Sequence, residues 1–212
     1  MNGIKWLFFD LDGTLTDSAP GLAESFTHVI QKHGIDIGDT DLRYFMGPPI
    51  TQSLAPYFNT EEALAEAIKD FRAHYSERML SGNSVYTGIA EMLEGLTAKR
   101  YRLAVVTGKP QDSAEKVIEH FKLSKYFEAI YGAKRLNTNK IETLREALDI
   151  HNCQPEQAVM VGDRKFDLGA AQLGKTGGIG VLWGYGNRDE LEKYNHLLLA
   201  NTPSEITKYF GA

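Results

Sequence analysis

The sequence has little of what several classes of protein need. Its single cysteine, Cys153, excludes an internal disulfide and a metal site built from several cysteines. No apolar run approaches the ~20 residues that span a membrane, and the opening MNGIKWLFFD lacks the basic region, long apolar core and cleavage site of a secretory signal. Lysine and arginine form no run, and the formal net charge of −5 gives no general attraction to nucleic acid or anionic lipid. We therefore expect a cytoplasmic protein that binds neither nucleic acids nor membranes.

What the chain does have is a regular alternation of short apolar runs and helical patterns over most of its 212 residues. Strands that alternate with helices favour a doubly wound α/β fold, in which a mainly parallel, Rossmann-like sheet carries helices on both faces. The runs are apolar at successive positions, which fits strands buried on both faces. The predicted strands are 4–9, 101–106, 128–132, 158–162, 179–183 and 196–200, and the predicted helices are 19–33, 88–98, 112–121, 139–149, 165–173 and 188–194.

One segment interrupts this alternation. Residues 35–86 show helical periods and no convincing strand, and Thr60 followed by two glutamates has the pattern of a helix N-cap with an acidic first turn. We interpret the segment as part of a helical subdomain inserted after the first strand–helix unit. The predicted domains are a core of residues 1–17 and 87–212 and an inserted α-helical subdomain of residues 18–86.

Polar side chains follow the predicted strands of the core. In an open parallel sheet, ligands bind beyond the carboxyl ends of the strands, so these positions are the informative ones. Neighbouring carboxylates repel one another unless a cation neutralises them, and Mg²⁺ suits a few carboxylates combined with water and phosphate oxygens. The positions concerned are Asp10, Asp12, Thr107, Gly108, Lys109, Lys140, Asp163 and Asp167.

The same positions can hold a phosphate group. Thr107 and the backbone amides around it can bind non-bridging phosphate oxygens, and Gly13 and Gly108 let the backbone approach a ligand closely. Lys140 supplies positive charge where negative charge must be stabilised. For Lys109 two interpretations remain open, a phosphate contact and an ordinary surface side chain.

These motifs resemble those of the haloacid dehalogenase-like hydrolases. FFDLDGTLTDS, VVTGKP, Lys140 and VGDRKFD match the four motifs of that family in order. The inserted helical segment is similar to the α-helical cap of the branch that contains phosphoglycolate phosphatase and β-phosphoglucomutase. The third motif departs from the common KPxP pattern, because Lys140 lies in NTNKIETLREAL, so Lys134 and Arg135 remain fallback candidates.

The resemblance implies a role for each matching residue. Asp10 would attack phosphorus and form an aspartyl-phosphate, and Asp12 would protonate the leaving oxygen and then activate water. An aspartate at position 12 favours phosphate-ester chemistry over dehalogenation, since a halide needs no proton. The implied Mg²⁺ ligands are Asp10, Asp163, Asp167 and the backbone carbonyl of Asp12, and the implied phosphate-binding residues are Thr107, Gly108 and Lys140.

The resemblance also implies a substrate class. We expect hydrolysis of a small phosphorylated metabolite, as in phosphoglycolate phosphatases or 5′-nucleotidases, with substrate choice made by the inserted segment. Arg43, Met46 and Gly47 are the candidates for contact with the leaving group, although an exposed ion pair explains Arg43 equally well. A sugar phosphomutase, which uses the same residues, and a catalytically idle member of the fold are the alternatives.

A different class of enzyme is suggested by GAAQLGKT at 169–176, which fits the phosphate-loop pattern of kinases and nucleoside triphosphatases. A working loop of that kind follows a strand and opens a helix. Here the predicted helix 165–173 precedes the lysine, so Lys175 is expected at a helix C-terminus, with Gly174 as the left-handed residue that ends the helix. WGYGNRDEL, further along, is interpreted as a glycine-rich turn before a short helix, and a position at the border of the phosphate site is the second interpretation.

Overall fold

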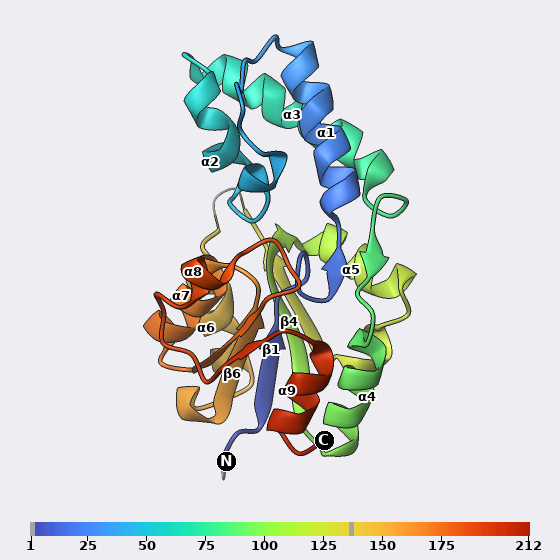
Figure 1. The fold of residues 1–212 in the computed structure, drawn as a ribbon, viewed down its shortest axis with the longest axis vertical. Coiled ribbons are helices and arrows are strands. Elements are labelled where there is room, and N and C mark those ends of the chain that lie inside the picture. The colour runs from blue at the N-terminus through green and yellow to red at the C-terminus, as the bar shows by residue number, and fades with distance from the viewer. Residues whose placement is uncertain (1–2, 136–137) are drawn as a thin grey trace. The chain divides into compact units, whose positions relative to one another are not determined.

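The computed structural model describes residues 3–135 and 138–212. Within these ranges the chain forms two compact units (Figure 1). The first unit combines the residues up to Thr16 with Val85–Ala212, and the second is Asp17–Ser84. No helix among the described residues is both long and apolar enough to cross a membrane.

The first unit is built on a parallel six-stranded sheet in the order β5-β4-β1-β6-β7-β8, which confirms the predicted fold class. Each strand is short and largely apolar because both faces of the sheet are covered. The strands are β1 (Trp6–Phe9), β4 (Arg102–Pro110), β5 (Ala129–Ala133), β6 (Ala158–Gly162), β7 (Gly177–Val181) and β8 (Leu198–Ala200).

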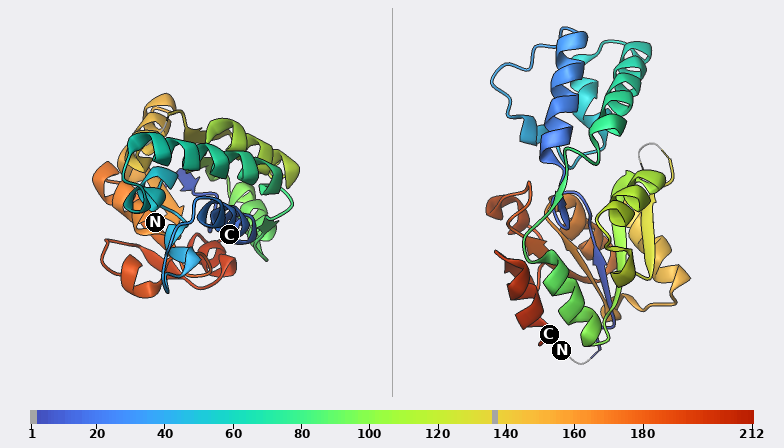
Figure 2. Two further views of the ribbon diagram at one scale, coloured as in Figure 1. Left: turned by 90° about the horizontal axis from the view of Figure 1, so that it is seen from above. Right: turned by 90° about the vertical axis from the view of Figure 1, so that its right-hand side faces the viewer.

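Helices cover both faces of this sheet. On one face, Trp6 and Phe8 of β1 pack with apolar side chains of α6 and α7 in one buried cluster. Leu7 and Phe9 alternate with them and are fully buried, so they face the other side of β1. Figure 2 shows α4 and α9 on that other side. The helices are α4 (Ile89–Ala98), α5 (Gln111–His120), α6 (Lys140–Ile150), α7 (Lys165–Gly174), α8 (Arg188–Leu191) and α9 (Pro203–Tyr209).

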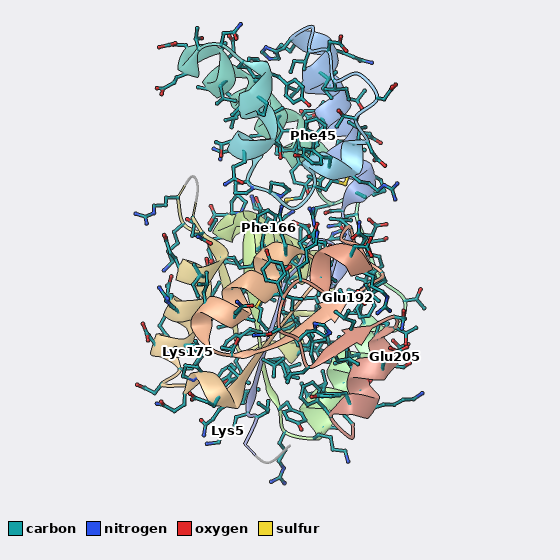
Figure 3. All side chains as sticks on the ribbon, turned by 60° about the vertical axis from the view of Figure 1, so that its left-hand side comes forward. Lys5, Phe45, Phe166, Lys175, Glu192 and Glu205 are labelled. Atoms are coloured by element: carbon teal, nitrogen blue, oxygen red, sulfur yellow. The ribbon has the colours of Figure 1, made fainter. Side chains whose placement is uncertain are left out.

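The second unit is helical. Thr60 caps α3, as its pattern predicted, because its side-chain oxygen accepts the N–H of Ala63 at 3.2 Å. Apolar side chains of α1, η1, α2 and α3 fill its core, and Tyr57 of η2 packs against it. The Phe26 and Phe71 rings lie 4.6 Å apart, with Phe45 beside them (Figure 3). The elements are α1 (Ala19–Lys32), η1 (Leu42–Phe45), α2 (Ile50–Leu54), η2 (Ala55–Tyr57) and α3 (Glu61–Arg78).

The ends of the helical unit meet. The N–H of Gly21 donates to the carbonyl of Gly82 at 3.0 Å, and a β-carbon on Gly82 would lie 2.6 Å from the α-carbon of Gly21. Both residues are therefore restricted to glycine by the close approach of the two chain segments. Two short strands, β2 (Thr16–Asp17) and β3 (Ser84–Val85), pair where the chain enters and leaves the unit.

Some boundaries differ from the predicted ones. β7 begins two residues earlier than predicted because its glycines pack closely, and a β-carbon on Gly177 would lie 2.7 Å from the Leu197 side chain. β4 continues beyond Val106 to Pro110, with a shift of register between these two residues. Helix α9 was not predicted, although Thr202 followed by Pro203 is a known pattern for a helix start.

The phosphate-loop interpretation of GAAQLGKT is wrong. Its first six residues lie inside α7, and Lys175 follows at the C-terminal end of that helix (Figure 3). The left-handed residue is Lys175, with φ +59°, and not Gly174 as predicted. Gly174 is buried in the last turn, where a β-carbon would lie 3.2 Å from the Leu144 side chain, so packing against α6 explains the glycine. The N-terminus of α7, whose free amides could hold a phosphate, lies at Lys165, at the opposite end of the helix from Lys175.

Candidate active site

Three aspartates gather at the carboxyl ends of neighbouring strands. Asp10 follows β1, Asp163 follows β6, which pairs with β1, and Asp167 lies in the first turn of α7. One carboxylate oxygen from each lies within 4.8 Å of the others, and all three residues are buried. The sheet therefore brings together the three carboxylates that the sequence nominated as metal ligands.

Lys140 lies against this cluster. It is the first residue of α6, which Asn139 caps by accepting the N–H of Ile141 at 3.3 Å. Its ammonium nitrogen is 2.7 Å from Oδ1 of Asp10 and 2.5 Å from Oδ1 of Asp167. The fallback candidates lie elsewhere on the surface, where Lys134 pairs with Glu146 and Arg135 with Glu142.

Burial and mutual repulsion shift the pKa values in the cluster. Burial raises the pKa of Asp10 to about 6, although the Lys140 ammonium lowers it in part. Burial raises the pKa of Asp163 well above its usual range, and the charges of Asp167 and Asp10 raise it further. Burial alone would lower the pKa of Lys140, but attraction to Asp10 and Asp167 outweighs it and the pKa is raised. Three carboxylates against one ammonium leave an excess of negative charge that a divalent cation can neutralise.

Asp163 is held by the WGYG loop, for which the sequence favoured a plain turn over a position at the border of the site. The backbone N–H of Tyr185 donates to its Oδ2 at 2.7 Å, and Thr14 donates to its Oδ1 at 3.3 Å. The indole of Trp183 donates to the carbonyl of Thr14 at 3.0 Å, so WGYG forms one wall of the site. A β-carbon on Gly184 would lie 2.2 Å from the backbone oxygen of Gly13. The glycine at this position is the one feature of the sequence that could have indicated this close contact.

Two further glycines lie close against the carboxylates of Asp163 and Asp167. Gly13 has φ +86°, and a β-carbon there would lie 2.4 Å from Oδ2 of Asp163. A β-carbon on Gly162 would lie 2.1 Å from Cγ of Asp167. The carboxylate of Asp167 is also fixed from its own helix, because its Oδ2 accepts the N–H of Arg164 at 2.9 Å.

Asp12 has a partner that the sequence left undecided. The ammonium of Lys109 lies 2.9 Å from Oδ2 and 3.1 Å from Oδ1 of Asp12. The Lys109 side chain is 3% exposed, so the surface interpretation of this residue is wrong. Thr107 accepts the N–H of Lys109 on its hydroxyl at 3.2 Å, and a β-carbon on Gly108 would meet no atom within 4 Å. Open space therefore adjoins Gly108, and Thr107, the preceding residue that is also predicted to bind phosphate, is buried.

The predicted specificity residues lie in the helical unit. Arg43 forms an exposed ion pair with Asp41, in which its NH2 and Nε lie 2.7 and 3.0 Å from Oδ2. An exposed ion pair was the second explanation of Arg43 that the sequence analysis left open. Met46 ends η1 by donating its N–H to the carbonyl of Arg43, and Gly47 has φ +102°. A contact of these three residues with substrate stays a prediction.

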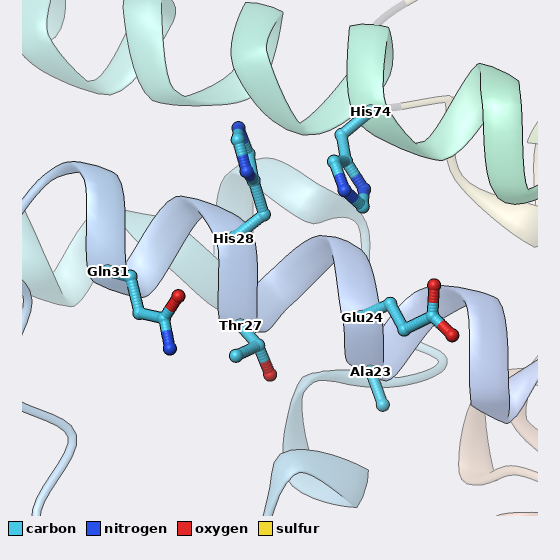
Figure 4. A pocket seen from close by; sticks show the side chains of 6 residues that line it. All are labelled: Ala23, Glu24, Thr27, His28, Gln31 and His74. Atoms are coloured by element: carbon cyan, nitrogen blue, oxygen red, sulfur yellow. The ribbon is translucent and has the colours of Figure 1, made fainter.

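The helical unit also has a shallow surface hollow between α1 and α3 (Figure 4). The rings of His28 and His74 are stacked there with centroids 4.4 Å apart, and His74 Nδ1 lies 3.0 Å from the hydroxyl of Ser25. Among the described residues, the aspartate cluster is the group that offers three side-chain ligands to one metal ion. The histidine pair therefore lacks the ligand number of a metal site.

Comparison with known proteins gives a consistent family. A model of the haloacid dehalogenase-like hydrolases matches residues 7–181. The 5′-nucleotidase of Pseudomonas aeruginosa is 37% identical over 89% of this chain and 87% of that protein. Tyrosine-protein kinase PtkA of Mycobacterium tuberculosis is 38% identical over 97% of this chain and 72% of that protein. A phosphoglycolate phosphatase of Aquifex aeolicus is 31% identical over 86% of both chains.

Solved structures agree with the sequence matches. A haloacid dehalogenase-like hydrolase from Streptococcus pneumoniae has a TM-score of 0.93 and 31% identity, over 99% of this chain and 100% of that one. The fold, the acidic site and these matches define the protein as a phosphoric monoester hydrolase. The chain belongs to the haloacid dehalogenase-like hydrolases, as its motifs predicted.

Proposed function

We propose that the protein is a Mg²⁺-dependent phosphatase that hydrolyses a small phosphomonoester through an aspartyl-phosphate on Asp10. The observation that carries the proposal is the buried cluster of Asp10, Asp163 and Asp167 with Lys140 between two of its carboxylates. Such a cluster costs stability in the folded protein because desolvation and repulsion raise the pKa values of Asp10 and Asp163. A phosphoryl site explains why the chain retains it.

The donor set fits Mg²⁺. All the candidate ligand atoms are oxygens, which a small hard cation prefers, and few carboxylates leave positions for water and phosphate. We assign the ion to the carboxylates of Asp10, Asp163 and Asp167, the last directly or through water, and to the backbone carbonyl of Asp12. Bound Mg²⁺ would neutralise the excess charge of the site and polarise the phosphoryl oxygens.

Four side chains carry the reaction in this proposal. Asp10 attacks phosphorus as the bond to the ester oxygen breaks, and Asp12 gives its proton to that leaving oxygen. Asp12 then takes a proton from water, which attacks phosphorus, releases phosphate and restores Asp10. Thr107, with the backbone at Gly108, binds the phosphoryl oxygens, and Lys140 holds Asp10 in line.

The substrate that we favour is a nucleoside 5′-monophosphate or phosphoglycolate, because relatives with these activities in their names align over most of the chain. We assign substrate choice to the helical unit, Asp17–Ser84. Replacing Arg43 by alanine tests this assignment on a confirmed substrate. An unchanged KM and kcat would exclude contact between Arg43 and the leaving group.

The central experiment measures phosphate release from p-nitrophenyl phosphate with and without Mg²⁺. Wild type should be active only with Mg²⁺, and Asp10→Asn should lose activity by several orders of magnitude because the nucleophile is lost. Asp112→Asn, which changes an exposed aspartate on α5, is the matched control and should retain activity. Turnover without Mg²⁺, or full activity of Asp10→Asn, would contradict the proposed mechanism.

Two alternatives give different products. A phosphomutase would convert a sugar phosphate into its isomer with little release of phosphate. A protein kinase is the alternative that the name of one relative raises. It would transfer phosphate from ATP to tyrosine and release none from simple monoesters. A panel of nucleotides, phosphoglycolate and hexose phosphates, with ATP and a tyrosine peptide as a separate reaction, distinguishes the three.

A further inference from the structure

The contact between Lys109 and Asp12 has no role in the mechanism proposed above. The ammonium of Lys109 reaches both carboxylate oxygens of Asp12, at 2.9 and 3.1 Å. Its side chain is 3% exposed, while that of Asp12 is 22% exposed. The buried member of the pair is therefore the lysine, and the aspartate is the member that solvent reaches.

Local hydrogen bonds hold the chain segments that carry Lys109 and Asp12. Lys109 lies between Val106 and Pro110, the stretch of β4 in which the register shifts, and its N–H donates to the hydroxyl of Thr107 at 3.2 Å. Asp12 lies in a tight turn after β1, where Gly13 donates its N–H to the carbonyl of Thr16 at 2.7 Å. Two chain segments that are each held by their own backbone hydrogen bonds thus present the two side chains to each other.

The ion pair restricts how the carboxyl group of Asp12 can turn. A partly exposed aspartate on its own populates several rotamers, and its terminal torsion is broad. Hydrogen bonds from one ammonium to both oxygens select one orientation of the carboxyl plane. When one oxygen carries a proton, the other can still accept from Lys109, so the contact persists in both forms of Asp12. A general acid must lie within hydrogen-bond reach of the atom that it protonates, so a fixed orientation contributes directly to rate.

We propose that Lys109 is a positioning residue that holds the Asp12 carboxyl group toward the leaving oxygen of the substrate. The inference rests on the proposed function, because it requires Asp12 to act as the acid. In that step the phosphorus–oxygen bond of the ester breaks, a bond forms between phosphorus and Asp10, and the proton of Asp12 moves to the departing oxygen. Loss of Lys109 should therefore slow hydrolysis most for substrates whose leaving oxygen must be protonated.

Two substrates of similar shape isolate this need. p-Nitrophenolate is a stable anion and leaves with little help, whereas the benzyl alkoxide is too basic to leave without a proton. The ratio kcat/KM reports the steps up to formation of the aspartyl-phosphate, and the later attack of water does not enter it. The experiment measures kcat/KM for p-nitrophenyl phosphate and benzyl phosphate with Lys109→Met, Lys109→Arg and the control Lys116→Met, which changes an exposed lysine of α5.

We expect Lys109→Met to lower kcat/KM for benzyl phosphate by about 10- to 100-fold, out of the ~10²–10⁴-fold that a general acid contributes, and for p-nitrophenyl phosphate by about threefold or less. Lys109→Arg keeps a charged donor and should recover most of the loss, and Lys116→Met should match wild type. Both substrates are assayed on one preparation, so incomplete folding of a variant lowers both rates equally and leaves their ratio unchanged.

Equal losses on both substrates, or none on either, would overturn the inference while leaving the phosphatase proposal intact. If wild type hydrolyses neither substrate with Mg²⁺ present, the proposed function fails, and the inference fails with it. A loss with Lys109→Arg as large as with Lys109→Met would also overturn it, because a retained charged donor would then make no difference and the effect would come from packing.

Discussion

Replacing Gly162 by alanine tests how tightly the acidic cluster is packed. Gly162 is the last residue of β6, and a β-carbon there would lie 2.1 Å from Cγ and 2.3 Å from Cβ of Asp167. The Cβ of Asp167 is fixed by the backbone of α7, so a change of side-chain rotamer can move Cγ but cannot relieve the contact with Cβ. The helix start itself would have to shift.

The structure sets the expected cost. Added atoms in a packed interior cost about 1–3 kcal/mol and sometimes more. A shift of Asp167 also loosens its bond to the N–H of Arg164, where loss of a helix cap costs about 1 kcal/mol. It separates Asp167 from Lys140 as well, and breaking a buried ion pair costs about 3–5 kcal/mol. Because these effects overlap, we expect Gly162→Ala to lower the free energy of unfolding by about 3–5 kcal/mol.

A neighbouring glycine provides the control. Gly169 lies half-buried in the middle of α7, and a β-carbon there would meet the Tyr194 ring at 3.4 Å. Gly169→Ala should be neutral or should stabilise the protein by up to about 1 kcal/mol, because alanine favours the helix. Urea unfolding of the metal-free proteins measures the change in the free energy of unfolding for both variants. A loss below about 1 kcal/mol for Gly162→Ala, or equal losses for the two variants, would refute this account of the packing.

Three further predictions concern pH and the end of α7. Mg²⁺ affinity, measured by calorimetry, should rise between about pH 5 and pH 7, because the raised pKa values mean that Asp10 and Asp163 must lose protons before they bind the ion. In metal-free protein, the folded state holds the proton of Asp10 more tightly than the unfolded chain does. Asp10→Asn should therefore gain up to about 3 kcal/mol over wild type as pH rises from about 4 to 6, in urea unfolding at each pH. Lys175→Gly should raise the free energy of unfolding by about 1 kcal/mol, since φ +59° favours glycine, and an unchanged midpoint would contradict this.

The acidic cluster was predictable because parallel strands bring their carboxyl ends to one edge. Asp10 and Asp163 each follow an apolar run, and adjacency of β1 and β6 places them together whatever the details of packing. Lys140 was predictable for a similar reason, as the first residue of a helix that starts at the same edge. These placements depend on topology, which periodicity reveals.

The supports of the cluster were not predictable in the same way. Tyr185 meets Asp163 through a backbone N–H, and a backbone group has no signature in the sequence. Gly184 is needed because of the carbonyl of Gly13, more than 150 positions away, so the contact depends on three-dimensional packing. Lys109 is buried in the stretch of β4 where the register shifts, and the pattern of apolar residues does not reveal such a shift.

The meeting of Gly21 and Gly82 has a consequence for how this chain can change. The polypeptide leaves the sheet and returns to it at one point, so in the topology of the core the whole helical unit is equivalent to a single long loop. Insertions whose ends lie close together place little demand on the fold that carries them. The helices between these two glycines can therefore change in sequence, and even in length, while the strand order and the aspartates at the strand ends stay as they are.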